Sequence, residues 1–172
     1  MGCVEAIWTA PEGSADMERH TEVAALADRG LSGDRYATGR GHYSGFDECQ
    51  VTVLASEALA EIQKRFGIDL SDGRHRRNVV VSGVDLDALL GLRFYAGNAV
   101  FEGTRPRPPC RHLEELASEE GVARALAGGR AGICADVVEG GTVGVGDTVE
   151  RLPESQTSDE IAAAIRDRHA EE

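Results

Sequence analysis

The sequence predicts a mostly β protein, a closed or nearly closed β-barrel with a few short peripheral helices. Three observations support this fold class. Short apolar or β-branched segments recur through the first 152 residues, glycine-containing turns separate several of them, and the helical patterns between them are too short for the crossovers of a βαβ fold. With 172 residues and 41% hydrophobic content, the chain can bury one sizeable core, and we expect one domain over residues 1–153.

The expected strands are short segments bounded by glycine, proline or polar residues. They cover residues 4–9, 21–26, 50–54, 78–81, 93–96, 98–102, 133–138, 142–145 and 148–152. Gly97 stands between two of these strands and predicts a hairpin. The pairs Gly140-Gly141 and Gly146-Asp147 predict two more hairpins near the C-terminal end of the barrel.

The clearest helix is expected over residues 56–66. Ser56 offers an N-cap hydroxyl, apolar residues recur at helical spacing through Ile62, and Gly67 provides a C-terminal stop. Shorter helical segments are expected at residues 85–91 and in two pieces of residues 112–127. The tail of residues 154–172 follows Pro153 and has the periodicity of a short helix.

Charge and hydropathy restrict the class of partner. The net charge is -12, from 30 acidic and 18 basic side chains, so nucleic acid and anionic membranes would be repelled. The chain has no apolar stretch long enough to span a bilayer, and its N-terminus lacks the order of a signal peptide. We therefore expect a soluble cytoplasmic protein that binds neither nucleic acid nor membrane.

The most unusual stretch is residues 104–112, which holds three prolines, three arginines, Cys110 and His112. Prolines make the segment stiff, and neighbouring cations lower the pKa of a thiol and favour the thiolate, the form that attacks electrophiles and ligates soft metals. Cys110 is therefore a candidate nucleophile or metal ligand. The alternative is a rigid connector that carries a buried, inert cysteine.

Six arginines gather in two short runs, Arg74, Arg76 and Arg77, then Arg105, Arg107 and Arg111. Positive charge kept together in an acidic chain indicates an anionic ligand, since guanidinium groups bind phosphate and carboxylate with two hydrogen bonds. The alternative is that each arginine pairs with one of the many acidic side chains.

The remaining cysteines and histidines are expected to be structural or solvated. The four cysteines are widely spaced, so we expect reduced thiols and a structural role for Cys3, Cys49 and Cys134. His75 is expected to be a solvated member of its basic run and His42 a loop residue, while His20 and His169 are expected at the surface.

Several motifs occur in the order found in one known family. They are residues 30–37 (GLSGDRYA), the glycine-rich run 39–44, residues 51–54 (VTVL), 76–80 (RRNVV), 85–91 (DLDALLG), 109–113 (PCRHL), and the closing Gly140-Gly141 with 145–147 (VGD). In this combination the chain resembles the MOSC domains, named for the C-terminal domain of molybdenum cofactor sulfurase, as a small stand-alone member. The resemblance covers nearly all of residues 1–152.

The resemblance implies a barrel of the pyruvate-kinase-barrel-like type and a molybdenum cofactor (molybdopterin) as ligand, with no expectation of pyridoxal phosphate. It assigns Cys110 as the sulfur-bearing or metal-ligating residue. Cofactor binding is assigned to seven residues: Asp34, Arg35, Arg77, Asn78, Thr104, Arg105 and His112. A sulfur donor or redox partner protein is implied with it.

Three functions remain open from the sequence, of which the plainest is a barrel that acts only through protein partners, with the tail after Pro153 as the natural contact. The other two involve a ligand. In the first, the protein is a molybdenum-cofactor-dependent oxidoreductase or a sulfur transferase that acts through Cys110. In the second, it is a non-catalytic module that binds or delivers a small anion or a cofactor.

Overall fold

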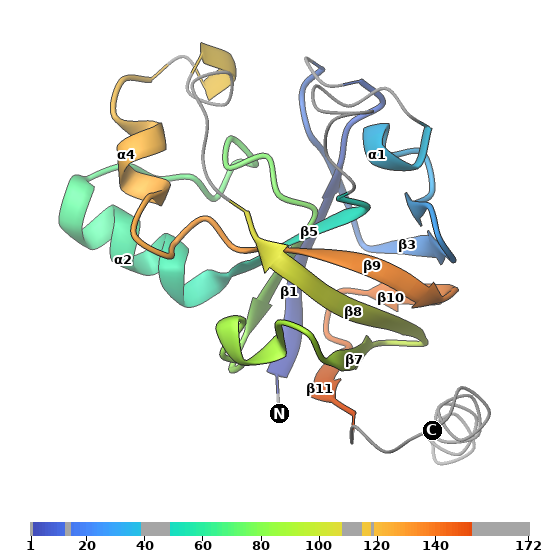
Figure 1. Ribbon diagram of the computed structural model, residues 1–172. Helices are drawn as coiled ribbons and strands as arrows, with labels where there is room; N and C mark the ends of the chain where they lie inside the picture. Colours follow the sequence, from blue (N-terminus) through green and yellow to red (C-terminus); the bar gives the residue numbers. More distant parts are fainter. Residues whose placement is uncertain (1, 13–14, 39–48, 108–114, 118, 153–172) are drawn as a thin grey trace.

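The computed structural model describes residues 2–12, 15–38, 49–107, 115–117 and 119–152. Seven strands form a closed ring in the order β11, β7, β8, β9, β5, β6, β1, and pairing of β1 with β11 closes it (Figure 1). Their bounds are β1 Gly2–Thr9, β5 Val51–Ala55, β6 Val79–Ser82, β7 Arg93–Ala96, β8 Ala99–Pro106, β9 Ile133–Glu139 and β11 Thr148–Arg151. A further strand, β2 (Glu18–His20), pairs with β1 outside the ring. The predicted barrel is confirmed.

One pair in the ring is parallel. Strands β5 and β6 run in the same direction, and the chain returns between them through helix α2 (Ser56–Phe66). All other pairs in the ring are antiparallel. The hairpin expected at Gly97 joins β7 to β8, and the residue has a φ of 59°, which glycine adopts without strain. The fold is thus a mixed barrel with a single short βαβ unit.

The two hairpins expected at Gly140-Gly141 and Gly146-Asp147 are wrong. Strand β10 (Gly141–Gly144) pairs with β3 (Glu22–Leu26) in a second sheet that continues to β4 (Gly30–Leu31). Gly141 serves another purpose there, because a Cβ at this position would collide with the Asn98 carbonyl. The glycine allows two backbones to approach closely rather than form a hairpin turn.

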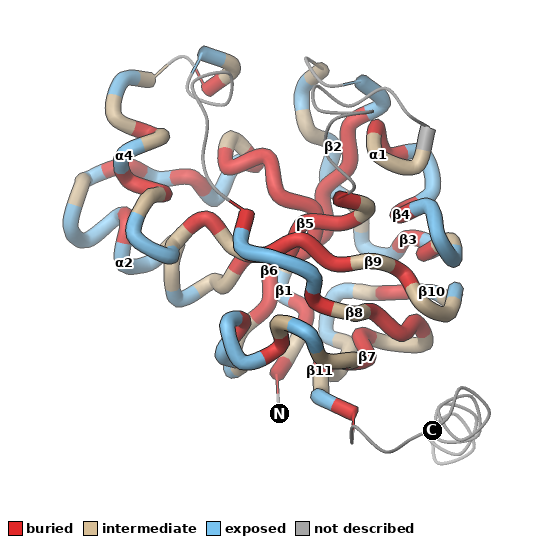
Figure 2. Tube along the Cα trace, in the orientation of Figure 1, coloured by how far each residue is buried: buried red, intermediate tan, exposed pale blue. Residues whose placement is uncertain are grey.

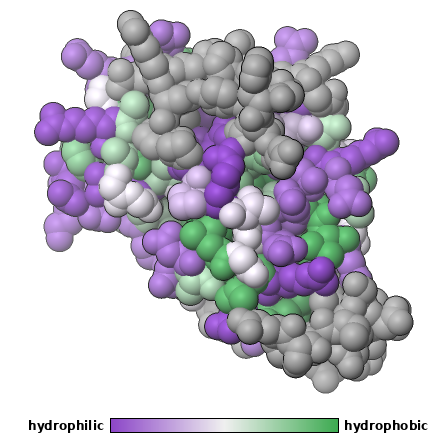
Figure 3. All heavy atoms as spheres, in the orientation of Figure 1, coloured by the Kyte–Doolittle hydropathy of each residue, from purple (hydrophilic) through white to green (hydrophobic). Residues whose placement is uncertain are grey.

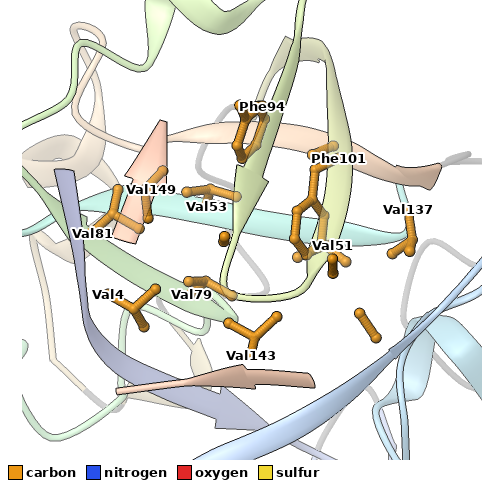
Figure 4. Packing of buried hydrophobic residues seen from close by; sticks show 14 of the residues in the cluster. Val4, Val51, Val53, Val79, Val81, Phe94, Phe101, Val137, Val143 and Val149 are labelled. Carbon is orange, nitrogen blue, oxygen red and sulfur yellow. The ribbon is translucent and has the colours of Figure 1, made fainter. Parts of the chain in front are cut away.

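The barrel interior is filled mainly by valines and two phenylalanines (Figure 4). Phe94 and Phe101 stack with ring centroids 5.6 Å apart, and they face valines of the opposite strands. Val23 and Val143, from the second sheet, belong to the same cluster. This core follows from alternating β-branched residues, whose inward members pack across the ring.

A smaller apolar cluster lies outside the barrel between α2 and α4 (Val122–Leu126). Ile62 of α2 and Leu126 of α4 are fully buried in it. The helix begins as expected at Ser56, but its N-cap is Ala55, and the Ser56 hydroxyl donates to Glu57 instead of capping the backbone. Gly67 ends the helix in the left-handed conformation, with a φ of 67°.

Two further helical elements are short. The 3-10 turn η1 (Asp87–Leu89) lies in the segment expected to be helical, and α1 (Arg35–Thr38) was not expected. The face of the molecule in Figure 3 presents both hydrophilic and hydrophobic side chains where residues are described. Among the described residues, no helix is long and apolar enough to cross a membrane. The tail of residues 154–172 lies outside the described residues.

Candidate anion-binding site

Arginines dominate the buried charged residues of the described chain. They are Arg35, Arg76, Arg77 and Arg107, which we call the arginine cluster. Among the described residues, Asp34 is the single buried carboxylate. Burying a guanidinium is expensive unless the protein or a ligand compensates its charge. This cluster in an acidic chain therefore marks the candidate site.

Asp34 organises one side of the cluster. Its carboxylate is completely buried and accepts hydrogen bonds from the Ala10 amide at 3.1 Å, from the Tyr36 amide at 3.3 Å and from Arg35 Nη1 at 3.0 Å. It thereby starts α1 and fixes the Arg35 guanidinium. Arg35 in turn donates from Nη2 to the Arg76 carbonyl at 3.0 Å, which connects α1 to the segment before β6.

The segment 75–81 is buried without interruption (Figure 2). Arg76 has a φ of 58°, a left-handed conformation that is uncommon for a residue with a side chain. Arg76 donates to the Ala15 carbonyl at 2.7 Å, and Arg77 donates to the Ala131 carbonyl at 2.7 Å. The two guanidinium groups are thus anchored to separate parts of the chain by neutral oxygens.

Burial and the neighbouring Arg35 guanidinium lower the pKa of Arg76 to about 10. The side chain therefore remains cationic at neutral pH. Tyr36 and the Asp16 and Asp34 carboxylates act in the opposite direction, so groups of both signs lie near Arg76.

Arg107 and Tyr36 extend the cluster to the end of β8. Arg107 Nη2 donates to the Tyr36 hydroxyl at 3.1 Å, and the Arg35 guanidinium lies 4.5 Å from the centroid of the Tyr36 ring. The tyrosine therefore lies against two members of the arginine cluster. Tyr36 was not among the predicted site residues. It directly follows Asp34 and Arg35 in the motif of residues 30–37, and this position was the sequence signal that could have identified it.

Asn78 connects three strands beneath the cluster. Its side-chain oxygen accepts from the Thr52 amide at 2.9 Å and from the Thr52 hydroxyl at 3.1 Å, while Nδ2 donates to the Trp8 carbonyl at 3.1 Å. These contacts hold β5 and β1 against the start of β6. Asn78 thus supports the segment that carries Arg76 and Arg77.

His75 is buried rather than solvated, so the sequence expectation is wrong. Its exposed fraction is 0%, and its ring meets the Trp8 ring edge-on with centroids 6.1 Å apart. Nδ1 accepts from the Arg77 amide at 2.9 Å. Burial, together with the charge of Arg77, lowers the pKa of His75 to about 3, so the imidazole is neutral.

The other predicted site residues are distributed differently. Thr104 and Arg105 are exposed on β8, and the Thr104 hydroxyl donates to the Cys134 carbonyl at 3.2 Å. Cys110 and His112 lie outside the described residues. Arg74 does not join the cluster, because it pairs with Glu119 at 2.6 Å and with Asp72 at 2.8 Å near the surface.

Cys49 and Cys134 form a disulfide, with Cα atoms 5.4 Å apart. The expectation that these thiols are reduced is therefore wrong. Their spacing of 85 residues gave no sign of the contact, which arises because Cys49 immediately precedes β5 and Cys134 lies on its neighbour β9. Cys3 is a free cysteine in the structure.

The arrangement can bind an anion. Most groups that the cluster presents are hydrogen-bond donors on cations, and they come from α1, from the segment before β6 and from the end of β8. Guanidinium groups contributed by separate elements suit a ligand with several acceptor oxygens, such as a phosphate. The described residues include no group of three or more His, Cys, Asp and Glu side chains arranged to hold a metal ion.

Comparisons with known proteins agree with this fold. The crystal structure of the YuaD protein from Bacillus subtilis superposes with a TM-score of 0.71 and 22% identity, covering 88% of this chain and 96% of that one. The structure of YiiM from Geobacillus stearothermophilus gives a TM-score of 0.69 and 18% identity, covering 99% and 85%. The structure of YiiM from Escherichia coli superposes with a TM-score of 0.62 and 17% identity, covering 94% of this chain and 75% of that one.

At these identities the likeness establishes the fold alone. A search of curated proteins finds no significant match. The MOSC domain family, by contrast, matches residues 40–150, which is more than half of the chain and includes Arg76, Arg77 and Arg107. The chain therefore belongs to the MOSC domain family.

Proposed function

We propose that the protein binds the molybdenum cofactor, or a related anionic ligand, at the arginine cluster, with Cys110 as the sulfur carrier or metal ligand. The observation that carries the proposal is the burial of four arginines with a single buried carboxylate among the described residues. A phosphate-bearing ligand would supply negative charge to these groups through charge-assisted hydrogen bonds.

The described residues fit the anionic part of such a cofactor. Arg76, Arg77 and Arg107 offer cationic donors, and the buried Nε2 of His75 has no hydrogen-bond partner in the described chain. Cys110 is the residue assigned to the metal or to sulfur. It follows Arg107 by three residues in the sequence.

The described residues have two kinds of task in this proposal. Arg76, Arg77 and Arg107 hold the anion, while Asp34 and Asn78 fix the backbone and side chains around them. A bound molybdenum cofactor supplies redox chemistry at its metal. The thiolate of Cys110 is a soft donor, suited either to that metal or to carrying sulfur as a persulfide.

The second candidate is a binding module without chemistry. It is favoured by the composition of the arginine cluster itself, which offers cationic donors for an anion without any contribution from Cys110. The two candidates differ in their dependence on the thiol: an enzyme or sulfur carrier loses activity in C110S, whereas a delivery module keeps its ligand affinity.

Anion binding is tested by titrating the purified protein with inorganic phosphate in a calorimeter. We expect saturable binding in the wild type and at least about tenfold weaker binding in R77M and in R107M, because each variant removes a charged donor. R74M is the matched control, since Arg74 comes from the same run but pairs with Glu119 and Asp72. Equal affinities in R77M, R107M and R74M would contradict the proposal.

A further inference from the structure

We propose that His75 is an additional ligand-binding residue of this site, a neutral donor whose Nε2–H bonds an oxygen of the bound anion. The inference rests on the proposed function, because it concerns the same ligand. It adds a residue that neither the family motifs nor the arginine pattern indicated.

The tautomer of His75 follows from its one hydrogen bond. A backbone N–H can only donate, so the contact from the Arg77 amide to Nδ1 at 2.9 Å requires an unprotonated Nδ1. A neutral imidazole must then carry its proton on Nε2. The low pKa of His75 agrees, since burial and the adjacent Arg77 charge both disfavour the doubly protonated ring.

The Nε2–H group is buried and has no acceptor among the described residues. A buried donor left without a partner has lost its hydrogen bond to water and gained none in the protein, which is why such groups are rare in native proteins and call for an explanation. An acceptor oxygen on a bound ligand would remove that penalty. The penalty therefore favours the liganded state of the site.

The ring is also held in a fixed position. On one side, the His75 ring contacts the Trp8 ring edge-on. Trp8 is itself held in place by Gly73, which packs so closely that a Cβ there would lie 2.8 Å from the indole. The bond to the Arg77 amide defines the other side. A donor held in this way loses little conformational freedom when a ligand binds.

The position of His75 relates it to the arginine cluster. It directly precedes Arg76 and Arg77, and its charge state responds to the Arg77 guanidinium. A neutral donor among cations adds a hydrogen bond without adding to the repulsion between them. His75 would thus favour a ligand rich in acceptor oxygens, such as a phosphate group, over one that carries donors.

The test is phosphate titration of H75N. Asparagine can place its Oδ1 near the position of Nδ1 and accept from the amide two residues on, as it does in Asx turns, but it cannot reach the position of Nε2. We expect H75N to keep a cooperative unfolding transition and to bind inorganic phosphate about tenfold or more weakly. H20N is the matched control, because His20 bonds to Thr9 outside the cluster.

A second measurement needs no variant. In the wild type, the imidazole Nε2–H signal in a ¹⁵N-correlated NMR spectrum should shift on addition of phosphate. The ring should keep a single proton, on Nε2. An unchanged signal at saturation, or equal phosphate affinity in H75N and wild type, would overturn the role of His75 while leaving anion binding intact. A wild type that binds no phosphate would overturn the proposed function and this inference together.

Discussion

Replacing Asp34 by Asn tests how the arginine cluster is held. The carboxylate is fully buried, contacts Arg35 at 3.0 Å, and accepts from the amides of Ala10 and Tyr36. Asparagine is almost the same size and keeps one acceptor oxygen, but it removes the negative charge. Arg35, whose exposed fraction is 3%, would remain buried without its carboxylate.

Breaking one side of a buried ion pair in this way costs about 3–5 kcal/mol, because a charge is left uncompensated away from water. This is a large fraction of the roughly 5–15 kcal/mol that stabilises a typical domain. We therefore expect D34N to lower the free energy of unfolding by about 3–5 kcal/mol, measured by urea denaturation with linear extrapolation.

The matched control is D72N. Asp72 also pairs with an arginine, Arg74, at 2.8 Å, but 56% of its side chain is exposed. Exposed pairs contribute about 0–1 kcal/mol, so D72N should unfold nearly as the wild type does. A D34N protein within about 1 kcal/mol of D72N would refute the view that Asp34 compensates a buried charge.

Three further predictions concern stability. G73A should lose more free energy of unfolding than G91A. Both glycines have positive φ, 91° and 76°, but a Cβ at Gly73 would lie 2.8 Å from the Trp8 ring, whereas Gly91 faces open space. Equal losses of stability in the two variants would contradict the close packing of Gly73 on Trp8. The pKa of His75 is about 3 in the folded chain, below its ordinary 6.5, so its stabilising contribution is complete above pH 6.5 and is lost at about 1.4 kcal/mol per pH unit as the pH falls toward 3. Unfolding measured across this range should show a flatter pH dependence in H75N, and parallel curves would refute the shift. Reducing the Cys49–Cys134 disulfide should lower the free energy of unfolding by about 2–4 kcal/mol, because it closes a long loop of 85 residues; identical urea midpoints with and without reductant would argue against the bond.

The barrel itself could be predicted from the sequence. Alternating β-branched residues mark the strands of the ring, and the glycine at position 97 correctly marks the turn between β7 and β8. Strand pairing near the C-terminal end could not be predicted in the same way. Gly140 and Gly141 look like hairpin residues, yet β10 pairs with β3, a partner more than 100 residues earlier in the chain. Turn residues report local backbone freedom and say nothing about distant partners.

The candidate site shows the same division between local and distant effects. Two arginine runs pointed to an anion, but Arg74, Arg76 and Arg77 look equivalent in sequence. The left-handed backbone at Arg76 separates them in space, so that Arg74 pairs near the surface and its neighbours are buried. The burial of His75 and the contact between Cys49 and Cys134 likewise depend on tertiary packing, for which the sequence holds no local signal.

Cofactor binding at the arginine cluster is tested most directly by elemental analysis for molybdenum together with fluorescent detection of oxidised pterin. The protein should be purified from a host that synthesises the cofactor, with the wild type, C110S and R77M handled in parallel. We expect molybdenum and pterin in proportion to the wild-type protein, loss of the metal in C110S, and loss of both in R77M. Absence of metal and pterin from all three proteins would contradict stable cofactor binding at this site.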